Sequence, residues 1–378
     1  MKKIYLDYNA STPVDEKVID VMMPYFKRDF GNPSSGHWAS GGAKTAIAKA
    51  RKQIASLLGC VPEEIVFTAG GSESNNQALK GVYSQLQSKG NHIITSKVEH
   101  PAIINPCTYL ESIGAEVTYV DVDQDGRVDP LQVEKAIKDT TILISIMHAN
   151  NEVGALQPIE EIGSIAKKNG ILFHSDAAQS IGKVPVKVDD LGVDLLSIAG
   201  HKLYAPKGIG ALYIRQGTPI SSFIHGAGHE DGRRAGTENT PYIVALGKAC
   251  ELADLHVLEI KNIRELRNYF WKELKKCYGD SIVVNGNLDK NLPNTLSVSF
   301  VGIEGEKILE KVPEIAASTG SACHSGNVEL SSVLKAMGIS KHVGMGAIRF
   351  SLGRATTVAE IDYALELIRT RIKSTVIS

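Results

Sequence analysis

Residues Ser197–Arg215, "SIAGHKLYAPKGIGALYIR", decide how the chain folds, because they place reactive side chains at the end of an apolar run. The first run stops at Gly200, His201 and Lys202, and a glycine-punctuated turn leads into a second apolar run. A lysine in this position is either a solvated strand end or a group held for chemistry. Which of the two applies depends on the residues at the other strand ends.

Short apolar runs alternate with helix-period segments between about residue 64 and residue 215. This alternation favours an α/β fold with a large, mainly parallel sheet and helices on both faces. The predicted strands are residues 64–69, 92–97, 116–122, 141–147, 171–176, 195–200 and 210–215.

The rest of the chain predicts a second, smaller domain of the α+β class. A long helical pattern covers residues 240–277, and apolar runs follow at 281–286, 295–302 and 346–353 with helical segments between them. No linker rich in Pro, Gly or Ser marks the boundary, so we place it near residue 258. The large domain is then expected at 14–258, and the small domain is expected to combine 1–13 with 259–378.

Composition and charge exclude several classes of function. The formal net charge of the 378 residues is −1, so no bulk positive field favours nucleic acid or an anionic membrane. No apolar run reaches the roughly 18 residues that a membrane-spanning helix needs, and Asp7 interrupts the first apolar stretch too early for a signal peptide. The five cysteines form no CxxC pair and are odd in number, which suits free thiols in a reducing cytoplasm.

The predicted strand at 64–69 is followed by Gly70, Gly71 and Ser72, where a helix is expected to begin. Small residues at a helix N-terminus offer backbone N–H groups and a hydroxyl to a phosphate, although the same residues also serve as an ordinary helix cap. The chain has no GxGxxG and no GxxxxGKS/T motif, which disfavours a dinucleotide or a nucleoside triphosphate.

Polar residues stand beyond the other predicted strands as well. His100, Asn151 and Asp176 each follow or end an apolar run, and Gln179 lies three residues after Asp176. Each alone is explained by a cap, a turn or a solvated loop. The carboxyl ends of parallel strands meet at one rim of a sheet, however, so these residues and Lys202 are expected to converge. A lysine for a Schiff base, an aspartate for a pyridinium nitrogen and a phosphate cradle together favour a pyridoxal phosphate site.

Long motifs spread over nearly the whole chain carry a family resemblance. They include "YLDYNASTPVD", "FTAGGSESNN", "ANNEVGALQPI", "HSDAAQSIGK", "RRAGTEN", "STGSACHSG" and "IRFSLGR". On these motifs the chain resembles the cysteine desulfurases of the NifS/IscS type, in the class V branch of the fold-type I pyridoxal phosphate enzymes. The resemblance implies conversion of L-cysteine to L-alanine, with the sulfur passed to an enzyme cysteine as a persulfide for iron–sulfur cluster or other sulfur-containing cofactor assembly.

The resemblance also implies a role for each residue at the strand ends. Lys202 would hold the cofactor as a Schiff base and move protons once the substrate is bound. Asp176 would keep the pyridine nitrogen protonated, and His100 would stack on the ring and assist as an acid or base. Gln179 would hydrogen-bond the phenolic oxygen of the cofactor, and Asn151 would contact the ring or the substrate carboxylate.

The phosphate of the cofactor is expected to have its own set of contacts. Thr237 would reach the phosphate of a neighbouring subunit, so the resemblance implies a homodimer. Many relatives have a serine where this chain has Ala199, so we expect slightly weaker phosphate binding, offset by backbone N–H groups at positions 199 and 200. The cofactor-binding residues implied at this end are Gly71, Ser72, Ala199, Gly200 and His201.

Arg349 is a candidate for binding the substrate carboxylate. Ile348, Phe350 and Leu352 alternate towards one face of the predicted strand, which leaves Arg349 and Ser351 on the other. A guanidinium on the cleft side suits bidentate capture of a carboxylate. The alternative is a structural ion pair. The resemblance favours the carboxylate role.

Cys323 is the candidate sulfur acceptor among the cysteines. Small residues surround it in "STGSACHSG", whereas Cys60, Cys107, Cys250 and Cys277 lie in or beside apolar or helical segments, where thiols are usually buried and inert. Cys323 lacks partners at the spacing of a zinc site, so no metal is expected. The resemblance places its sulfur acceptor here, on a mobile loop that would visit both the cofactor and an acceptor such as an iron–sulfur scaffold protein.

Three alternatives stay open. A selenocysteine lyase, which cleaves L-selenocysteine to L-alanine and selenide, shares the framework and has a Cys-His-Ser sequence at the same loop. A scaffold without turnover would not need the intact set of Lys202, Asp176, His100 and Cys323. An aminotransferase of the same fold would not need Cys323.

Overall fold

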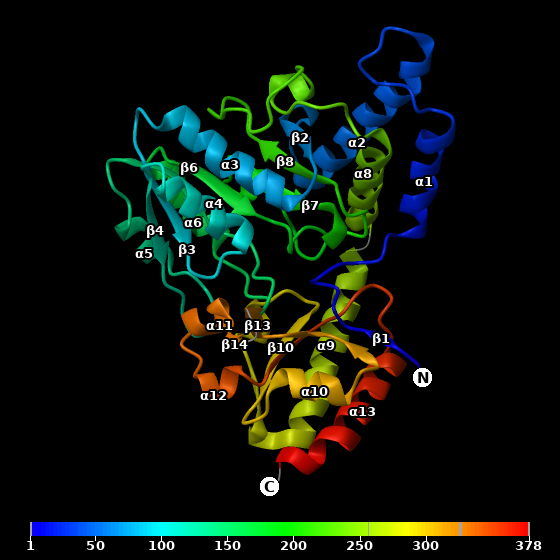
Figure 1. The fold of residues 1–378 in the computed structure, drawn as a ribbon, viewed down its shortest axis with the longest axis vertical. Helices are drawn as coiled ribbons and strands as arrows, with labels where there is room; N and C mark the ends of the chain where they lie inside the picture. The colour runs from blue at the N-terminus through cyan, green and yellow to red at the C-terminus, as the bar shows by residue number, and fades with distance from the viewer. Residues whose placement is uncertain (1, 256, 325–326, 377–378) are drawn as a thin grey trace.

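A seven-stranded sheet forms the centre of the larger part of the molecule (Figure 1). The computed structural model describes the backbone of residues 2–255, 257–324 and 327–376, and the side chains of residues 2–254, 260–320 and 329–372. Only β8 runs antiparallel to its neighbours β2 and β7, and the other neighbours are parallel. In spatial order the strands are β2 (Ile65–Thr68), β8 (Gly210–Ile214), β7 (Leu195–Ala199), β6 (Leu172–Asp176), β5 (Thr141–Ser145), β3 (His92–Ser96) and β4 (Glu116–Val120). All seven predicted strands are confirmed.

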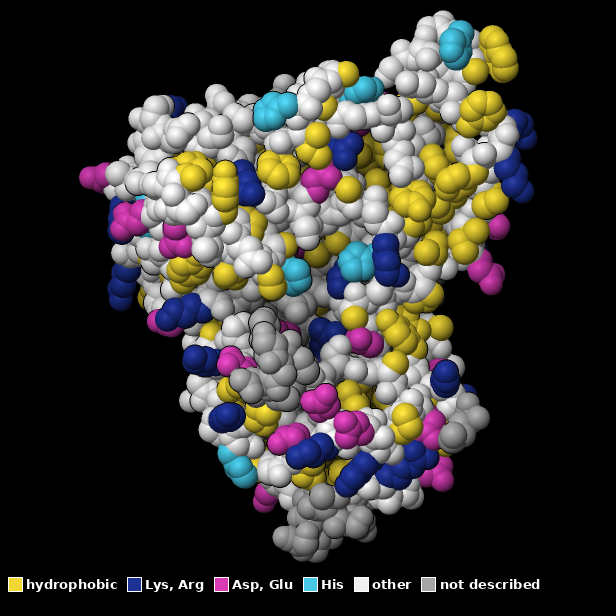
Figure 2. All heavy atoms as spheres, in the orientation of Figure 1, with side chains coloured by type: hydrophobic (Ala, Val, Ile, Leu, Met, Phe, Trp, Pro, Cys, Tyr) yellow, Lys and Arg dark blue, Asp and Glu magenta, His cyan; other side chains and the backbone are white. Residues whose placement is uncertain are grey.

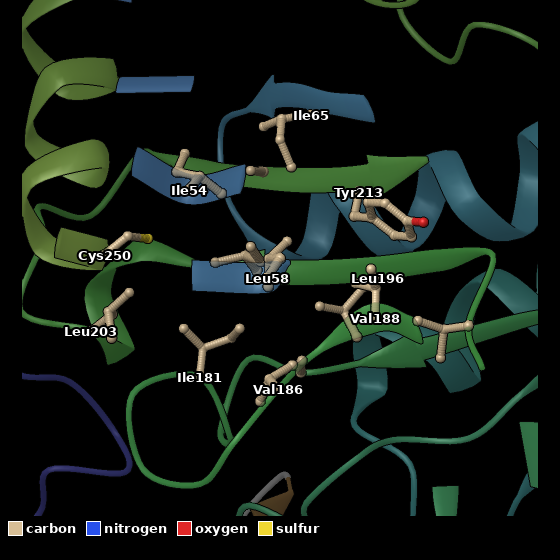
Figure 3. Close-up of a cluster of buried hydrophobic side chains, with 14 of the residues drawn as sticks. Ile54, Leu58, Ile65, Ile181, Val186, Val188, Leu196, Leu203, Tyr213 and Cys250 are labelled. Carbon is tan, nitrogen blue, oxygen red and sulfur yellow. The ribbon is translucent and has the colours of Figure 1, made fainter. Parts of the chain in front are cut away.

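Helices cover both faces of this sheet, as the sequence predicts. Successive residues of a strand point to opposite faces, so Leu195 of β7 packs with α3 (Gly71–Leu86) and α4 (Pro101–Glu111). Leu196 of the same strand packs on the other side with α2 (Gly41–Leu58), α6 (Ile159–Lys168) and α8 (Thr240–Leu255). Figure 3 shows part of this second cluster, where Ile54 and Leu58 of α2 lie over the strands. The other α-helices of this region are α1 (Glu16–Lys27), α5 (Pro130–Lys135) and α7 (Val188–Leu191).

A smaller antiparallel sheet forms the other part of the molecule (Figure 1). In spatial order it contains β12 (Ser318–Thr319), β15 (Ala347–Ser351), β10 (Thr295–Phe300) and β9 (Ile282–Val284). Three of its strands match the apolar runs predicted at 281–286, 295–302 and 346–353. The helices of this part are α9 (Val257–Tyr278), α10 (Gly305–Lys311), α11 (Ser332–Ala336), α12 (Lys341–Gly344) and α13 (Val358–Val376).

The N-terminal segment joins the core of this smaller part. Strand β1 (Ile4–Tyr5) pairs in parallel with β11 (Ile315–Ala316), and Ile4 and Leu6 are buried in the same cluster as Phe270 of α9. The long helical pattern predicted at 240–277 forms α8 and α9 on either side of residue 256, which lies outside the described residues. The division into domains at residue 258 stays a prediction.

The segment that contains Cys323 forms a β-hairpin. Strand β13 (Ser321–His324) pairs with β14 (Asn327–Leu330), and Cys323 lies opposite Val328. The side chains of residues 321–328 lie outside the described part of the structure. Among the helices that are described, none combines the length and the apolar character needed to cross a membrane.

Candidate active site

A cavity of about 390 Å³ lies at the carboxyl ends of the parallel strands. Asp176 ends β6, Ala199 ends β7, and the turn Gly200–Lys202 follows directly, so the sheet itself delivers these residues to one rim. Arg349 of β15 lines the same cavity from the smaller sheet. The predicted site residues that line it are Gly71, Ser72, His100, Asn151, Asp176, Gln179, Ala199, His201, Lys202 and Arg349.

Lys202 presents its amine to this cavity. Its Nζ donates hydrogen bonds to the backbone oxygens of Asn9 at 2.6 Å and Ala10 at 2.7 Å. Burial, together with the charge of Arg349, lowers the pKa of Lys202 to about 8, even though Asp7 and Asp176 act in the opposite direction. An amine whose pKa lies this close to neutrality is available both as a nucleophile and as a proton carrier.

Asp176 is buried in the wall of the cavity with only 6% of its surface exposed. Its Oδ2 accepts a hydrogen bond from Asn75 Nδ2 at 2.7 Å, and its Oδ1 accepts one from the backbone N–H of Ala178 at 2.9 Å. Asn75 is itself 1% exposed, so the bond is shielded from competing water. The two donors fix the orientation of the carboxylate in the wall.

His100 caps the N-terminus of α4 and lines the cavity. Its Nδ1 accepts a hydrogen bond from the backbone N–H of Ala102 at 3.1 Å, so the neutral ring carries its proton on Nε2. Burial lowers the pKa of His100, and the charge of Lys202 acts in the same direction against that of Asp176. The neutral ring therefore has one N–H to donate.

The start of α3 forms one end of the cavity. The first N–H groups of this 16-residue helix have no carbonyl partner one turn earlier, which suits an anion. A Cβ on Gly71 would lie 3.2 Å from the Cβ of Ala199, so the glycine keeps this end open. Burial, with the charges of Lys202 and Lys207, lowers the pKa of His201 to about 4 and leaves a neutral imidazole here.

Gly200 lies beside the cavity and is not among the residues that line it. Its N–H donates to the backbone oxygen of Ile209 at 2.9 Å, because the chain turns there between β7 and β8. This N–H therefore already has a partner, and compensation for the missing hydroxyl at Ala199 by the backbone of residues 199 and 200 stays a prediction.

Thr237 lies outside the cavity lining and is exposed. The neighbouring Arg234 donates to Glu73 at 2.9 Å, which ties this segment to the first turn of α3. The contact of Thr237 with a partner subunit stays a prediction.

Arg349 forms the ion pair that was the alternative to carboxylate binding. Its Nη2 donates to Asp7 Oδ1 at 2.7 Å and to Ser318 Oγ at 2.8 Å, and its Nη1 donates to the backbone oxygen of Asn151 at 2.8 Å. The predicted alternation is present, since the neighbouring Ile348 is fully buried while Arg349 lines the cavity. The Nε of Arg349 is buried and lacks a hydrogen-bond partner among the described residues. Its role towards a substrate stays a prediction.

The other cysteines differ in their capacity to react. Burial raises the pKa of Cys60, Cys107 and Cys250 to about 12, which disfavours the thiolate in all three. Cys277, in contrast, is exposed near the end of α9. The expectation that its helical surroundings bury it is wrong. In Figure 1 this end of α9 points away from the large sheet, and Cys277 is not among the residues that line the cavity.

Four residues of the site environment were not predicted from the sequence. Asn9 and Asn75 stand inside motifs that carry the family resemblance, but no local pattern distinguishes them from turn and helix residues. Glu99 is 4% exposed, and burial raises its pKa to about 8 although Met147 N–H and Ser96 Oγ donate to it. The fourth is Lys183, whose Nζ lies 3.0 Å from Gln179 Oε1.

Comparison with known proteins agrees with this geometry. Residues 4–364 match the family described as aminotransferase class-V. The chain belongs to this family. The match covers both sheets and every predicted site residue, including Cys323.

Several relatives carry a more specific name. The chain is 50% identical to a protein named cysteine desulfurase IscS from Dictyoglomus turgidum, over 97% of this chain and 94% of that one. It is 47% identical to a protein of the same name from Klebsiella pneumoniae, over 97% of this chain and 92% of that one. Among solved structures, one titled NifS-like protein superimposes with a TM-score of 0.93 at 38% identity, covering 98% of this chain and all of that chain. Another, titled SspA in complex with cysteine, has a TM-score of 0.82 at 41% identity and covers 94% and 100% of the two chains.

Proposed function

We propose that this protein is a cysteine desulfurase that converts L-cysteine to L-alanine and transfers the sulfur to Cys323. The observation that carries the proposal is the convergence of the Lys202 amine, the Asp176 carboxylate and the Arg349 guanidinium on one cavity. The family match and the names of the relatives support the same reaction. These names support a desulfurase and not the alternative of a selenocysteine lyase.

Pyridoxal 5′-phosphate is the cofactor that the cavity fits. The amine of Lys202 and the carboxylate of Asp176 face one space, and the helix start at Gly71 is kept open for a phosphate. Lys202 would hold the cofactor, Asp176 would pair with its ring nitrogen, and Ser72 and His201 would contact its phosphate. When bound, the cofactor withdraws electrons from the substrate Cα and so weakens the bond between Cβ and sulfur.

The residues of the chain position the substrate and move its protons. Arg349 binds the carboxylate of L-cysteine, because its guanidinium lines the cavity and is held there by three hydrogen bonds within the protein. Lys202 removes the Cα proton, for which its lowered pKa suits it. His100, neutral and with its proton on Nε2, is placed to donate a hydrogen bond into the cavity.

Sulfur transfer requires a thiolate at Cys323. This thiolate attacks the sulfur of the substrate, so that an S–S bond forms as the Cβ–S bond breaks. The electron pair of the broken bond stays on the carbon side, which takes up a proton and leaves as alanine. The persulfide on Cys323 then passes to an acceptor, for which we propose an iron–sulfur scaffold protein in the cytoplasm.

A homodimer is part of the proposal. Figure 2 shows hydrophobic side chains gathered on the surface at the α1 side of the molecule. The exposed apolar residues of α1 and the segment after it are Ile19, Met23, Phe26, Phe30 and Trp38. A patch of this kind marks a protein–protein interface more often than a free surface. The exposed Thr237 would reach the cavity of the second subunit.

The direct test is to incubate the cofactor-loaded protein with L-cysteine and dithiothreitol and to quantify alanine and sulfide. Wild type should release equal amounts of both, and Cys323→Ala should release neither. Cys277→Ala is the matched control, because Cys277 is an exposed thiol that does not line the cavity, and its loss should leave both products unchanged. Alanine and sulfide released at the wild-type rate by Cys323→Ala would refute the proposed sulfur acceptor.

A further inference from the structure

Lys183 is a cationic side chain behind the cavity to which the proposed reaction gives no task. It lies in the turn after β6, four residues beyond Gln179. Its Nζ is 3.0 Å from Gln179 Oε1 and 3.3 Å from Asn9 Oδ1. Gln179 and Asn9 are 4% and 1% exposed, so water does not replace these contacts.

An ammonium group decides how a neighbouring side-chain amide is oriented. It has only donors, so an amide beside it must turn its oxygen towards it and its NH₂ group away. Gln179 obeys this rule, since its Nε2 points to the other side and donates to the backbone oxygen of Asn9 at 2.9 Å. That oxygen also accepts the hydrogen bond from Lys202, so the NH₂ group of Gln179 is directed to the cavity wall where the reactive lysine stands.

Asn9 is oriented by the same rule. Its Oδ1 faces Lys183 and also accepts from Asn294 Nδ2 at 3.0 Å, while its Nδ2 donates to Thr295 Oγ1 at 2.8 Å. Two donors therefore hold the oxygen of Asn9 on the side of Lys183. The backbone of Asn9, which receives both Gln179 and Lys202, is fixed as a consequence.

We propose that Lys183 is a positioning residue that holds the Gln179 amide with its NH₂ group towards the cavity, so that Gln179 donates to the phenolic oxygen of the cofactor. The inference rests on the proposed function, because that oxygen belongs to pyridoxal phosphate. Lys183 thereby makes Gln179 a donor towards the cofactor, whereas an amide that nothing orients can present either its oxygen or its NH₂ group.

The charge state of Lys183 is compatible with this role. Burial, with the charges of Lys202 and Arg349, lowers the pKa of Lys183 to about 7. Below this pKa the ammonium has only donors and imposes the orientation of the Gln179 and Asn9 amides, whereas the neutral amine present at higher pH also has a lone pair, so the orienting effect is strongest below about pH 7.

The test is a pH titration of the visible absorbance of the cofactor-loaded enzyme. A donor to the phenolic oxygen stabilises its negative charge and so lowers the pKa of the chromophore. In Lys183→Met this pKa should rise by about one unit, which is a tenfold gain in proton affinity. Lys183→Arg keeps a cationic donor and should titrate close to wild type. Lys168→Met, which removes an exposed lysine that does not line the cavity, should titrate as wild type.

A double-mutant comparison separates positioning from support of the fold. Gln179→Leu should raise the pKa of the chromophore as Lys183→Met does, and adding Lys183→Met to Gln179→Leu should produce no further rise. Additive shifts would overturn the inference, because Lys183 would then act independently of Gln179. If Lys183→Met does not fold, Lys183→Gln takes its place, because its amide presents an oxygen or an NH₂ group equally and fixes no orientation.

The outcomes also separate this inference from the proposed function. A titration of Lys183→Met or Lys183→Gln that superimposes on wild type would overturn the inference alone, with the cofactor visibly bound. A wild-type protein that develops no yellow absorbance with pyridoxal phosphate would refute the proposed function, and the inference with it.

Discussion

Replacement of Asn9 by alanine should destabilise the protein more than a typical point mutation does. The Nδ2 group donates to Thr295 Oγ1 at 2.8 Å and to the backbone oxygen of Asn151 at 3.3 Å. The Oδ1 atom accepts from Asn294 Nδ2 at 3.0 Å and from Lys183 Nζ at 3.3 Å. Asn9 is 1% exposed, so Asn9→Ala removes four hydrogen bonds from the interior, although each of the four partners keeps one other bond.

The size of the effect follows from these contacts. A hydrogen bond contributes about 0.5–1.5 kcal/mol net to stability, and the two shorter bonds of Asn9 are expected to contribute most. Adding a smaller term for the longer contacts, we expect the free energy of unfolding to fall by about 3 kcal/mol, against about 1 kcal/mol for an average substitution. The affinity for the cofactor should also fall, because the backbone of Asn9 receives Lys202.

The assay is urea unfolding of the protein without cofactor, analysed by linear extrapolation. Asn169→Ala is the matched control, because Asn169 makes one bond of 2.8 Å to the backbone oxygen of Ile165 at an exposed helix end. This control should change the free energy of unfolding by about 0.5 kcal/mol or less. An Asn9→Ala protein that is as stable as this control would refute the reasoning.

Three further predictions concern charge and reactivity. Asp176→Asn should lower kcat at least about a hundredfold while the cofactor still binds, since the charge facing the ring nitrogen is lost; unchanged turnover would contradict this. The rate at which unloaded protein captures pyridoxal phosphate should rise with pH to a midpoint at about 8, because Lys202 reacts only as the free amine and its pKa is lowered. Stopped-flow absorbance measures this rate, and a midpoint near 10.5 would contradict it. Iodoacetamide at about pH 8 should leave Cys60, Cys107 and Cys250 of the folded protein unmodified in a mass spectrum, because burial raises the pKa of each thiol to about 12.

The large sheet could be predicted from the sequence because its strands are buried on both faces. Such strands are continuous apolar runs, and Leu195 and Leu196 pack into different clusters on the two sides. The residues beyond the strand ends could then be placed together by topology alone. Asp176 and Lys202 line one cavity although 26 positions in the numbering separate them, since β6 and β7 are parallel neighbours.

The partners of these residues could not be predicted in the same way. Asn9 meets Lys183 and Thr295 only because the N-terminal segment joins the smaller sheet and then crosses to the larger one. No local pattern encodes such a contact. Helix periodicity does not predict the exposure of Cys277 either. Phe270 and Leu274 are buried, and position 277 lies seven and three residues after them, on the face that periodicity assigns to the core, yet Cys277 is exposed near the end of α9.

The ion pair of Arg349 and its proposed role towards substrate are compatible for a physical reason. A guanidinium buried in a cavity without a counter-charge is costly, so the protein needs Asp7 beside it when no substrate is bound. Asp7 occupies only Nη2, and the backbone oxygen of Asn151 occupies Nη1, while Nε lacks a partner. A substrate carboxylate therefore meets a cation that is already held in place by β15, and its arrival exchanges or shares one hydrogen bond without having to order the side chain. The ion pair between Arg349 and Asp7 therefore does not compete with the proposed role, because it holds the guanidinium in the position from which it would bind the substrate carboxylate.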